Sequence, residues 1–339
     1  MKRLYNSVWI GVLCAAAGLV GCAKKTPTQE SVVVYVSVDQ QVSEPILAEF
    51  EKQTGVKVLA RYDTEASKTV GLVQRLRSEA ANPGADVFWS GEIFHTIHLA
   101  REGLLQPYQN TTTQDWPRLF RDEKRLWYGF SLRGRVIAYN TTKVSPEKAP
   151  RTLEDILKPE WRGRVVMARP QFGTTGGDVA SWFVHYGQDK AKAILAGLKA
   201  NDIRLADGNS SAVRMVATGQ ADVCFTDTDD VYAGQRNGWP IAMNPLDQAG
   251  DGSLVIPNTA GIVKGCPNPI AAAKLMEFLL SEQQERLQAQ SDSHNYPVHM
   301  ELHAEFDAYA IIWPLEVNYQ KVADALPEAI RIAGEIFKD

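Results

Sequence analysis

Residues 31–89 read SVVVYVSVDQQVSEPILAEFEKQTGVKVLARYDTEASKTVGLVQRLRSEAANPGADVFW. Short β-branched runs predict strands, and apolar residues at helical spacing predict helices between them. The expected elements, in chain order, are a strand over 31–38, a helix over 43–55, a strand over 56–62, a helix over 68–81 and a strand over 85–89. Strands joined by helices run parallel with right-handed crossovers. The loops that leave these strands should therefore lie along one sheet edge, where ligands bind in such folds.

A second series of the same kind follows. Its expected elements are strands over 164–168, 203–205 and 221–225, and helices over 177–186, 189–200 and 210–218. Two extended apolar segments, 127–139 and 253–263, lie between and after the two series. Two crossing segments imply two lobes joined by two strands. We therefore expect an α/β fold whose lobes have mixed, mainly parallel sheets: lobe 1 from residues 31–130 plus 262–315, and lobe 2 from 131–261 plus 316–339.

The composition is that of an ordinary globular protein. The chain has 339 residues, 45% of them hydrophobic and 22% charged, with 36 basic and 40 acidic residues. This length corresponds to about two domains. No excess of positive charge is available to neutralise a phosphate backbone, so nucleic acid is not expected as a partner. The sequence also lacks the G-x-S-x-G, P-loop, G-x-G-x-x-G and HExxH motifs, and we expect no enzyme.

The first thirty residues predict export. Lys2 and Arg3 precede the apolar run 8–20, which is too short to span a membrane and fits a secretory signal peptide over 1–21. The run ends in Leu-Val-Gly-Cys22, which resembles the bacterial lipobox. A lipid on Cys22 would hold the protein to a membrane of the cell envelope, in the periplasm, through a tether over 22–30. The alternative is a plain signal peptide. Cys224 and Cys266 lie in apolar stretches and are expected as unpaired thiols, although an oxidising compartment permits a disulfide bond between them.

Several short motifs are spread along the chain. They are Val34-Tyr35, EFEKQTG over 49–55, PGADVF over 83–88, Gly103-Leu-Leu, RGRVIAYN over 133–140, Gly208-Asn-Ser210, GQADV over 219–223 and Tyr296-Pro-Val298. In this order and spacing, nearly all of residues 31–339 resembles the periplasmic solute-binding proteins of ATP-driven importers, in the ferric-ion-binding group. The resemblance implies the type II periplasmic binding protein fold and capture of a small solute by hinge closure. It also implies delivery to an ABC permease in the inner membrane, by a protein expected to be a monomer.

The sequence departs from the ferric-binding pattern at the positions that bind the metal. Members of that group usually place two adjacent tyrosines after the strand that corresponds to 221–225, and here Asp229 and Asp230 stand there. Asp39 takes a position often held by histidine. Gly91 stands where a ligand glutamate is common, and Glu92 follows one residue later.

The substituted residues are all oxygen donors. Asp39, Glu92, Asp229 and Asp230 should converge on the cleft, where they would repel one another without a cation. Such a set suits Ca²⁺, Mg²⁺, Mn²⁺ or Fe(III). The first hypothesis is therefore capture of iron or another hard cation. The alternatives are an organic ammonium held by ion pairs and by aromatic rings, among them Trp89, a plain solvated turn over 227–230, and a sensor module without transport.

Two glycine-rich segments should favour a bound anion. Residues 173–177 and 208–211 each precede an expected helix, whose free N–H groups attract phosphate, carbonate, carboxylate or a phosphonate-like solute. Helix capping by the same residues is the simpler interpretation. The candidate anion-binding or solute-binding residues are Thr174, Thr175, Asn209, Ser210, Asp227, Arg133, Arg135 and Trp89. The two arginines lie on the first crossing segment, and they either reach an anion or pair with nearby acids.

Overall fold

The computed structural model describes residues 29–64, 67 and 69–338. The expected signal peptide over 1–21 and the expected lipid attachment at Cys22 lie outside these residues. Within the described part, none of the helices combines the length and the apolar character that a membrane crossing requires.

The described residues form ten strands, of which eight match the expected positions with small shifts at their ends, while the two over 105–106 and 241–245 were not expected. They are β1 (Ser31–Val36), β2 (Lys57–Tyr62), β3 (Val87–Ser90), β4 (Leu105–Gln106), β5 (Tyr128–Asn140), β6 (Val165–Ala168), β7 (Arg204–Ala206), β8 (Val223–Asp227), β9 (Ile241–Pro245) and β10 (Val255–Val263).

Twelve α-helices surround these strands in the described part. They are α1 (Gln40–Thr54), α2 (Val70–Ser78), α3 (Phe94–Arg101), α4 (Leu153–Ile156), α5 (Gly173–His185), α6 (Gln188–Ala200), α7 (Asn209–Ala217), α8 (Thr228–Arg236), α9 (Pro269–Leu279), α10 (Glu282–Gln290), α11 (His303–Phe306) and α12 (Tyr319–Ile336). Short 3-10 turns include η2 (Arg118–Phe120), η3 (Pro159–Trp161), η4 (Met300–Leu302) and η5 (Asp307–Tyr309).

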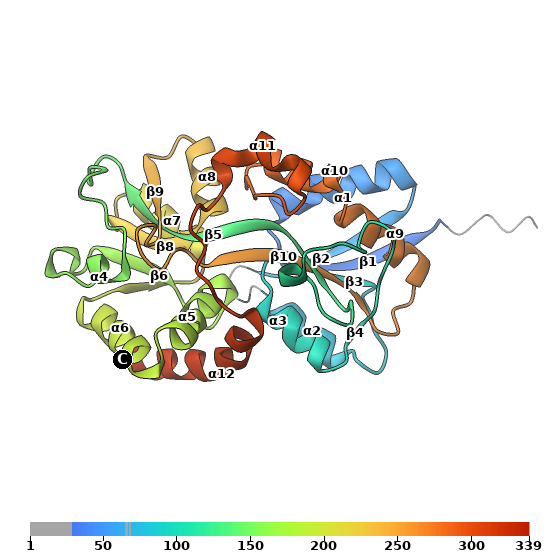
Figure 1. Cartoon of the computed structure of the whole chain (residues 1–339), viewed down its shortest axis with the longest axis horizontal. Coiled ribbons are helices and arrows are strands. Elements are labelled where there is room, and N and C mark those ends of the chain that lie inside the picture. The colour runs from blue at the N-terminus through green and yellow to red at the C-terminus, as the bar shows by residue number, and fades with distance from the viewer. Residues whose placement is uncertain (1–28, 65–66, 68, 339) are drawn as a thin grey trace, which may run out of the picture.

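The strands form one continuous mixed sheet with two halves. Its order is β2-β1-β3-β10-β5-β8-β6-β7, with β4 beside β10 and β9 beside β5. Half A contains β1 to β4 and β10, and half B contains β6 to β9. The long strand β5 belongs to both, because residues between 128 and 134 pair with β10, residues 135–139 pair with β8 and residues 136–140 pair with β9. Figure 1 shows half A on the right and half B on the left, joined by β5 and β10. The expected α/β fold with a mixed sheet is confirmed.

Each half contains three strands that run parallel to one another. β1 pairs in parallel with β2 and β3, and β6 pairs in parallel with β7 and β8. The carboxyl ends of β1, β3, β6, β7 and β8 are followed by α1, α3, α5, α7 and α8. The C-terminal helix α12 packs against α5 and α6 of half B and against α3 of half A.

Helix α5 begins earlier than expected. The prediction placed the helix at 177–186 and treated residues 173–177 as a loop, but these residues form the first turn of α5. The reason is close packing: a Cβ on Gly176 would lie 2.6 Å from the carbonyl oxygen of Pro170, and one on Gly177 would lie 2.0 Å from the Phe94 ring. The glycines are therefore needed for the close approach of the helix to its neighbours.

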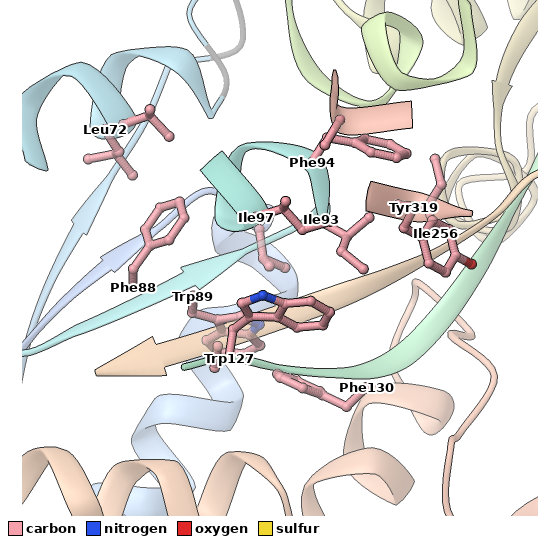
Figure 2. Packing of buried hydrophobic residues seen from close by; sticks show 14 of the residues in the cluster. Leu72, Phe88, Trp89, Ile93, Phe94, Ile97, Trp127, Phe130, Ile256 and Tyr319 are labelled. Atoms are coloured by element: carbon pink, nitrogen blue, oxygen red, sulfur yellow. The ribbon is translucent and has the colours of Figure 1, made fainter. Parts of the chain in front are cut away.

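The core of half A places large aromatic side chains on both faces of the sheet. Trp89, Phe88 and Phe130 are fully buried, and Trp127 packs nearby with only 2% of its surface exposed. Figure 2 shows these rings among Ile93, Ile97 and Ile256. The ring centroids of Trp89 and Phe130 are 6.3 Å apart. Trp89 is therefore part of the hydrophobic core.

Candidate functional site

An acidic cavity of about 30 Å³ lies where the carboxyl ends of the strands from the two halves meet. Six carboxylates and one guanidinium line it: Asp39, Glu92, Asp207, Asp227, Asp229, Asp230 and Arg133. A volume of this size is enough for a water molecule or a metal ion. The cavity therefore combines a surplus of negative charge with very little space. Below we call it the acidic cavity.

Three of the carboxylates belong to the start of α8. One oxygen each from Asp227, Asp229 and Asp230 can be chosen so that all three lie within 4.8 Å of one another. Asp230 accepts hydrogen bonds from Ser210 Oγ at 3.0 Å and from Thr226 Oγ1 at 2.9 Å. Asp229 and Asp230 lie in the first helical turn, where the positive end of the helix dipole stabilises negative charge. These groups form a compact set of oxygen donors.

Asp227 is held by a buried polar network. Its Oδ1 accepts a hydrogen bond from Arg135 Nη1 at 2.8 Å, and its Oδ2 accepts from Thr174 Oγ1 at 2.6 Å and Asn209 Nδ2 at 3.0 Å. Arg135 also donates to Asp178 Oδ2 at 3.0 Å. Burial by itself would raise the pKa of Asp227, but Arg135 and the other partners lower it. Asp227 is therefore an ionised carboxylate held in a fixed orientation. Because it is buried, the alternative of a plain solvated turn over 227–230 is wrong.

Arg133 connects the two halves. Its Nη1 donates to Asp229 Oδ2 in half B at 2.6 Å, and its Nη2 donates to the Gly91 carbonyl oxygen in half A at 2.5 Å. Its Nε lies 3.5 Å from Asp227 Oδ2. Burial would lower the pKa of Arg133, but Asp229 and Asp227 outweigh it and raise the pKa above its usual value. The guanidinium thus supplies positive charge to the acid cluster.

Glu92 and Asp39 line the cavity from half A. Glu92 is 1% exposed and accepts hydrogen bonds from the N–H groups of Phe94 and His95 at 2.7 and 3.2 Å, at the start of α3. Burial would raise the pKa of Glu92, but the neighbouring His95 imidazole and these N–H groups lower it. Asp39 lies at the start of α1, where its side chain makes no helix-capping hydrogen bond.

The starts of α5 and α7 also form part of the cavity wall. Their N-cap residues are Phe172 and Gly208, and neither helix has a side-chain cap. The expected capping by Thr174, Thr175, Asn209 and Ser210 is therefore wrong. These side chains bond to one another and to aspartates instead: Thr175 Oγ1, for example, donates to Asn209 Oδ1 at 3.0 Å. The helix starts remain electrostatically suited to an anion.

The packing also shows where Trp89, Tyr232 and the two cysteines lie. Trp89 does not line the acidic cavity, because its side chain lies in the core. Tyr232, in α8, makes edge-to-face contacts with His294 and Tyr309, with ring centroids 4.9 and 5.4 Å away, and does not line the cavity either. Neither ring can therefore hold an organic ammonium in the acidic cavity, where Phe172 is the aromatic residue of the described lining. Cys224 and Cys266 are both unpaired, as expected.

The sequence interpretation missed Asp207. This residue lines the acidic cavity immediately before the Gly208-Asn-Ser210 motif, and its carboxylate lies 3.9 Å from Arg169 Nε. The motif itself marks the end of β7, so the residue before it could have been included.

Fold and site together define a two-part binding protein with an acidic cavity between its parts. Residues 82–313 match the model of the family described as bacterial extracellular solute-binding protein. The chain belongs to this family. The expected class of protein is therefore confirmed.

Individual relatives agree with this assignment. The chain is 30% identical over 321 residues to iron uptake protein A1 of Synechocystis, covering 91% of this chain and 87% of that one. It is 26% identical to the major ferric iron-binding protein of Neisseria meningitidis, covering 77% and 79%. The crystal structure of apo ferric ion-binding protein A of Pasteurella haemolytica superposes with a TM-score of 0.80 at 26% identity, covering 91% and 100%. The fold is that of type II periplasmic binding proteins, as expected.

Proposed function

We propose that this protein captures iron or another hard cation, with a small anion such as phosphate or carbonate, and delivers it to an ABC permease in the inner membrane. The observation that carries the proposal is the acidic cavity, in which six carboxylates and one guanidinium surround about 30 Å³. Crowded carboxylates suit hard cations, which prefer oxygen ligands. The names of the relatives, which refer to iron uptake and ferric iron binding, support iron as the cargo.

The two kinds of group in the cavity wall support a cation bound together with an anion. Asp227, Asp229 and Asp230 supply the closest set of oxygen donors, and Asp39 faces them from half A. The uncapped starts of α5 and α7 supply N–H groups and positive dipole ends for the anion.

The remaining features of the proposal concern the whole protein. The lobes are residues 31–130 with 262–315 and residues 131–261 with 316–339, which close on the cargo about β5 and β10. The lipobox-like sequence before Cys22 supports export and a lipid anchor. We propose a monomer without catalytic activity, a role that agrees with relatives named for uptake and binding.

A titration of the purified protein tests the cation. Fe(III), supplied as its nitrilotriacetate complex, should bind one ion per chain, as measured by calorimetry and elemental analysis. Asp229→Asn and Asp230→Asn should each weaken binding about tenfold or more, because each removes a charged ligand worth about 1.5–3 kcal/mol. Asp189→Asn, an exposed position on α6, is the matched control and should leave the affinity unchanged.

Two results would overturn the proposal. One is the absence of binding for Fe(III), Mn²⁺ and Ca²⁺ alike. The other is an unchanged affinity in both variants. Thermal-shift measurements with choline and with methylphosphonate test the organic alternative, because only a true ligand raises the unfolding temperature by mass action.

A further inference from the structure

A second cavity, much larger than the acidic cavity, lies on the other face of β5. Its volume is about 1090 Å³, and its walls come from α3, residues 118–127, β5, β10 and residues 309–320. Successive side chains of a strand point to opposite faces. Leu132 and Gly134 accordingly line this cavity, while Arg133 and Arg135 direct their guanidinium groups to aspartates of the acidic cavity. We call it the large cavity.

The inner wall of the large cavity is apolar and firmly held. Trp127 and Tyr319 are 2% and 8% exposed, and the Tyr319 hydroxyl donates a hydrogen bond to the Val255 carbonyl oxygen at 2.7 Å. Figure 2 shows Trp127 beside Ile97, with Tyr319 further along the same side of the sheet. Other apolar lining residues, all partly exposed, are Phe120, Leu126, Leu132, Leu315 and Val317. A hydrocarbon or aromatic body covering these side chains would gain hydrophobic stabilisation.

Basic side chains without an acidic partner among the described residues lie at the mouth of the large cavity. Its lining includes Arg101, Arg118, Arg121 and Lys124 together with Asp122, Glu123 and Glu316, while the guanidinium of Arg133 pairs with Asp229 in the acidic cavity. Arg101 is paired with Asp324 at 2.5 Å. In the described part of the chain, Arg118 and Lys124 have no carboxylate at ion-pair distance. Asp122 Oδ1 is engaged locally, since it accepts the N–H of Lys124 at 2.8 Å. The mouth is therefore suited to a single anionic group.

We propose that the large cavity binds an amphiphilic carboxylate, a small organic acid with an aromatic or branched aliphatic body. The body would cover the wall formed by Trp127, Leu315 and Val317, and the carboxylate would lie at the mouth near Arg118 and Lys124. The cavity volume of about 1090 Å³ is slightly above the range of about 300–1,000 Å³ that is usual for small-molecule pockets. This site does not depend on the proposed capture of a cation, because the two cavities share only Arg133 among their lining residues.

Calorimetry with naphthalene-2-carboxylate tests the site in the full chain. One molecule should bind per chain with a Kd of about 1 mM or tighter. Naphthalene-2-carboxamide, which lacks the charge, and acetate, which lacks the apolar body, should both bind at least about tenfold more weakly. Saturating Fe(III) nitrilotriacetate should not displace the naphthoate.

Two variants locate the ligand. Arg118→Gln combined with Lys124→Gln should weaken naphthoate binding about tenfold and leave carboxamide binding unchanged. Leu315→Trp should fill the cavity and abolish binding of both compounds, with the unfolding temperature measured to verify folding. Lys148→Gln, an exposed lysine elsewhere, is the matched charge control.

The proposal is overturned if naphthoate produces no binding heat up to several times the expected Kd. It is also overturned if binding persists unchanged in folded Leu315→Trp, or if the double variant binds naphthoate as tightly as the original chain. Displacement by the iron complex would place the molecule in the acidic cavity and would equally refute it.

Discussion

Replacing Arg133 by Gln should strengthen the binding of hard cations. The guanidinium lies 2.6 Å from Asp229 Oδ2 and 3.5 Å from Asp227 Oδ2, the oxygens that a cation would use. A cation on these oxygens would lie within about 5 Å of the guanidinium, where two unit charges repel by about 3 kcal/mol at an effective dielectric constant of about 20. The cation must therefore displace Arg133 from its place in the acid cluster.

The magnitude follows from the bonds that are lost. Displacement breaks the hydrogen bonds to Asp229 and to the Gly91 carbonyl oxygen. Hydrogen bonds to charged groups contribute about 1.5–3 kcal/mol each. Hydration of the released guanidinium offsets part of the free energy lost when these bonds break. A net gain of roughly 1.4–2.8 kcal/mol for Arg133→Gln corresponds to a Kd about 10–100-fold lower.

The assay is chelator competition for Fe(III) and direct calorimetry for Mn²⁺ in both proteins. Arg162→Gln, which removes an exposed guanidinium paired with Asp202, serves as the control. Small-angle scattering of the empty protein gives a second readout. Loss of the connection between Gly91 and Asp229 should increase the radius of gyration. A weaker affinity in Arg133→Gln would refute the reasoning and show that Arg133 holds the anion or the carboxylates in place.

Three further predictions follow from individual contacts. Gly177→Ala should weaken cation binding and open the empty protein in small-angle scattering, because its Cβ would lie 2.0 Å from the Phe94 ring and overpacking costs about 1–3 kcal/mol. Burial lowers the pKa of His98, whose Nε2 bonds to the Ala323 carbonyl oxygen at 2.8 Å. The free energy of unfolding should therefore be largest above about pH 6.5 and fall as the pH drops through the lowered pKa. Urea titrations should show this slope, and His98→Gln should reduce it. Finally, the pKa values of Asp227 and Glu92 are lowered, so neither carboxylate should release a proton when a cation binds, as checked by calorimetry in two buffers of different ionisation enthalpy.

Most of the sheet could be predicted because its signals are local. The β-branched runs and their helical connections are read directly from residues 31–89, and β5 and β10 follow from two apolar segments. The start of α5 could not be predicted in this way. Gly176 and Gly177 have low helix propensity, and they are helical only because α5 approaches Pro170 and Phe94 too closely for any side chain. That reason appears only once distant segments are packed together.

The candidate site, too, could be predicted only in part from the sequence. The rule that ligands bind at the carboxyl ends of parallel strands selects Asp39, Glu92 and the aspartates of α8, and all of them line the acidic cavity. The roles of individual side chains were not accessible. Trp89 lies in a strand buried on both faces, whose uninterrupted apolar run gives no indication of which face a side chain occupies. The sequence likewise left open whether Arg133 pairs with an acid or with an anion.

The fold supplies positive charge to the acid cluster from two directions. Arg133 and Arg135 are two residues apart on β5, so strand alternation brings both guanidinium groups to the same face, where they pair with Asp229 and Asp227. The parallel strands bring the positive ends of their following helices to the same edge. A cation that enters therefore competes with charges already in place. The arginine, being tethered, can withdraw without leaving the protein, whereas the helix ends cannot. Of the arginine and the helix ends, Arg133 is consequently the source of positive charge that a bound cation can displace.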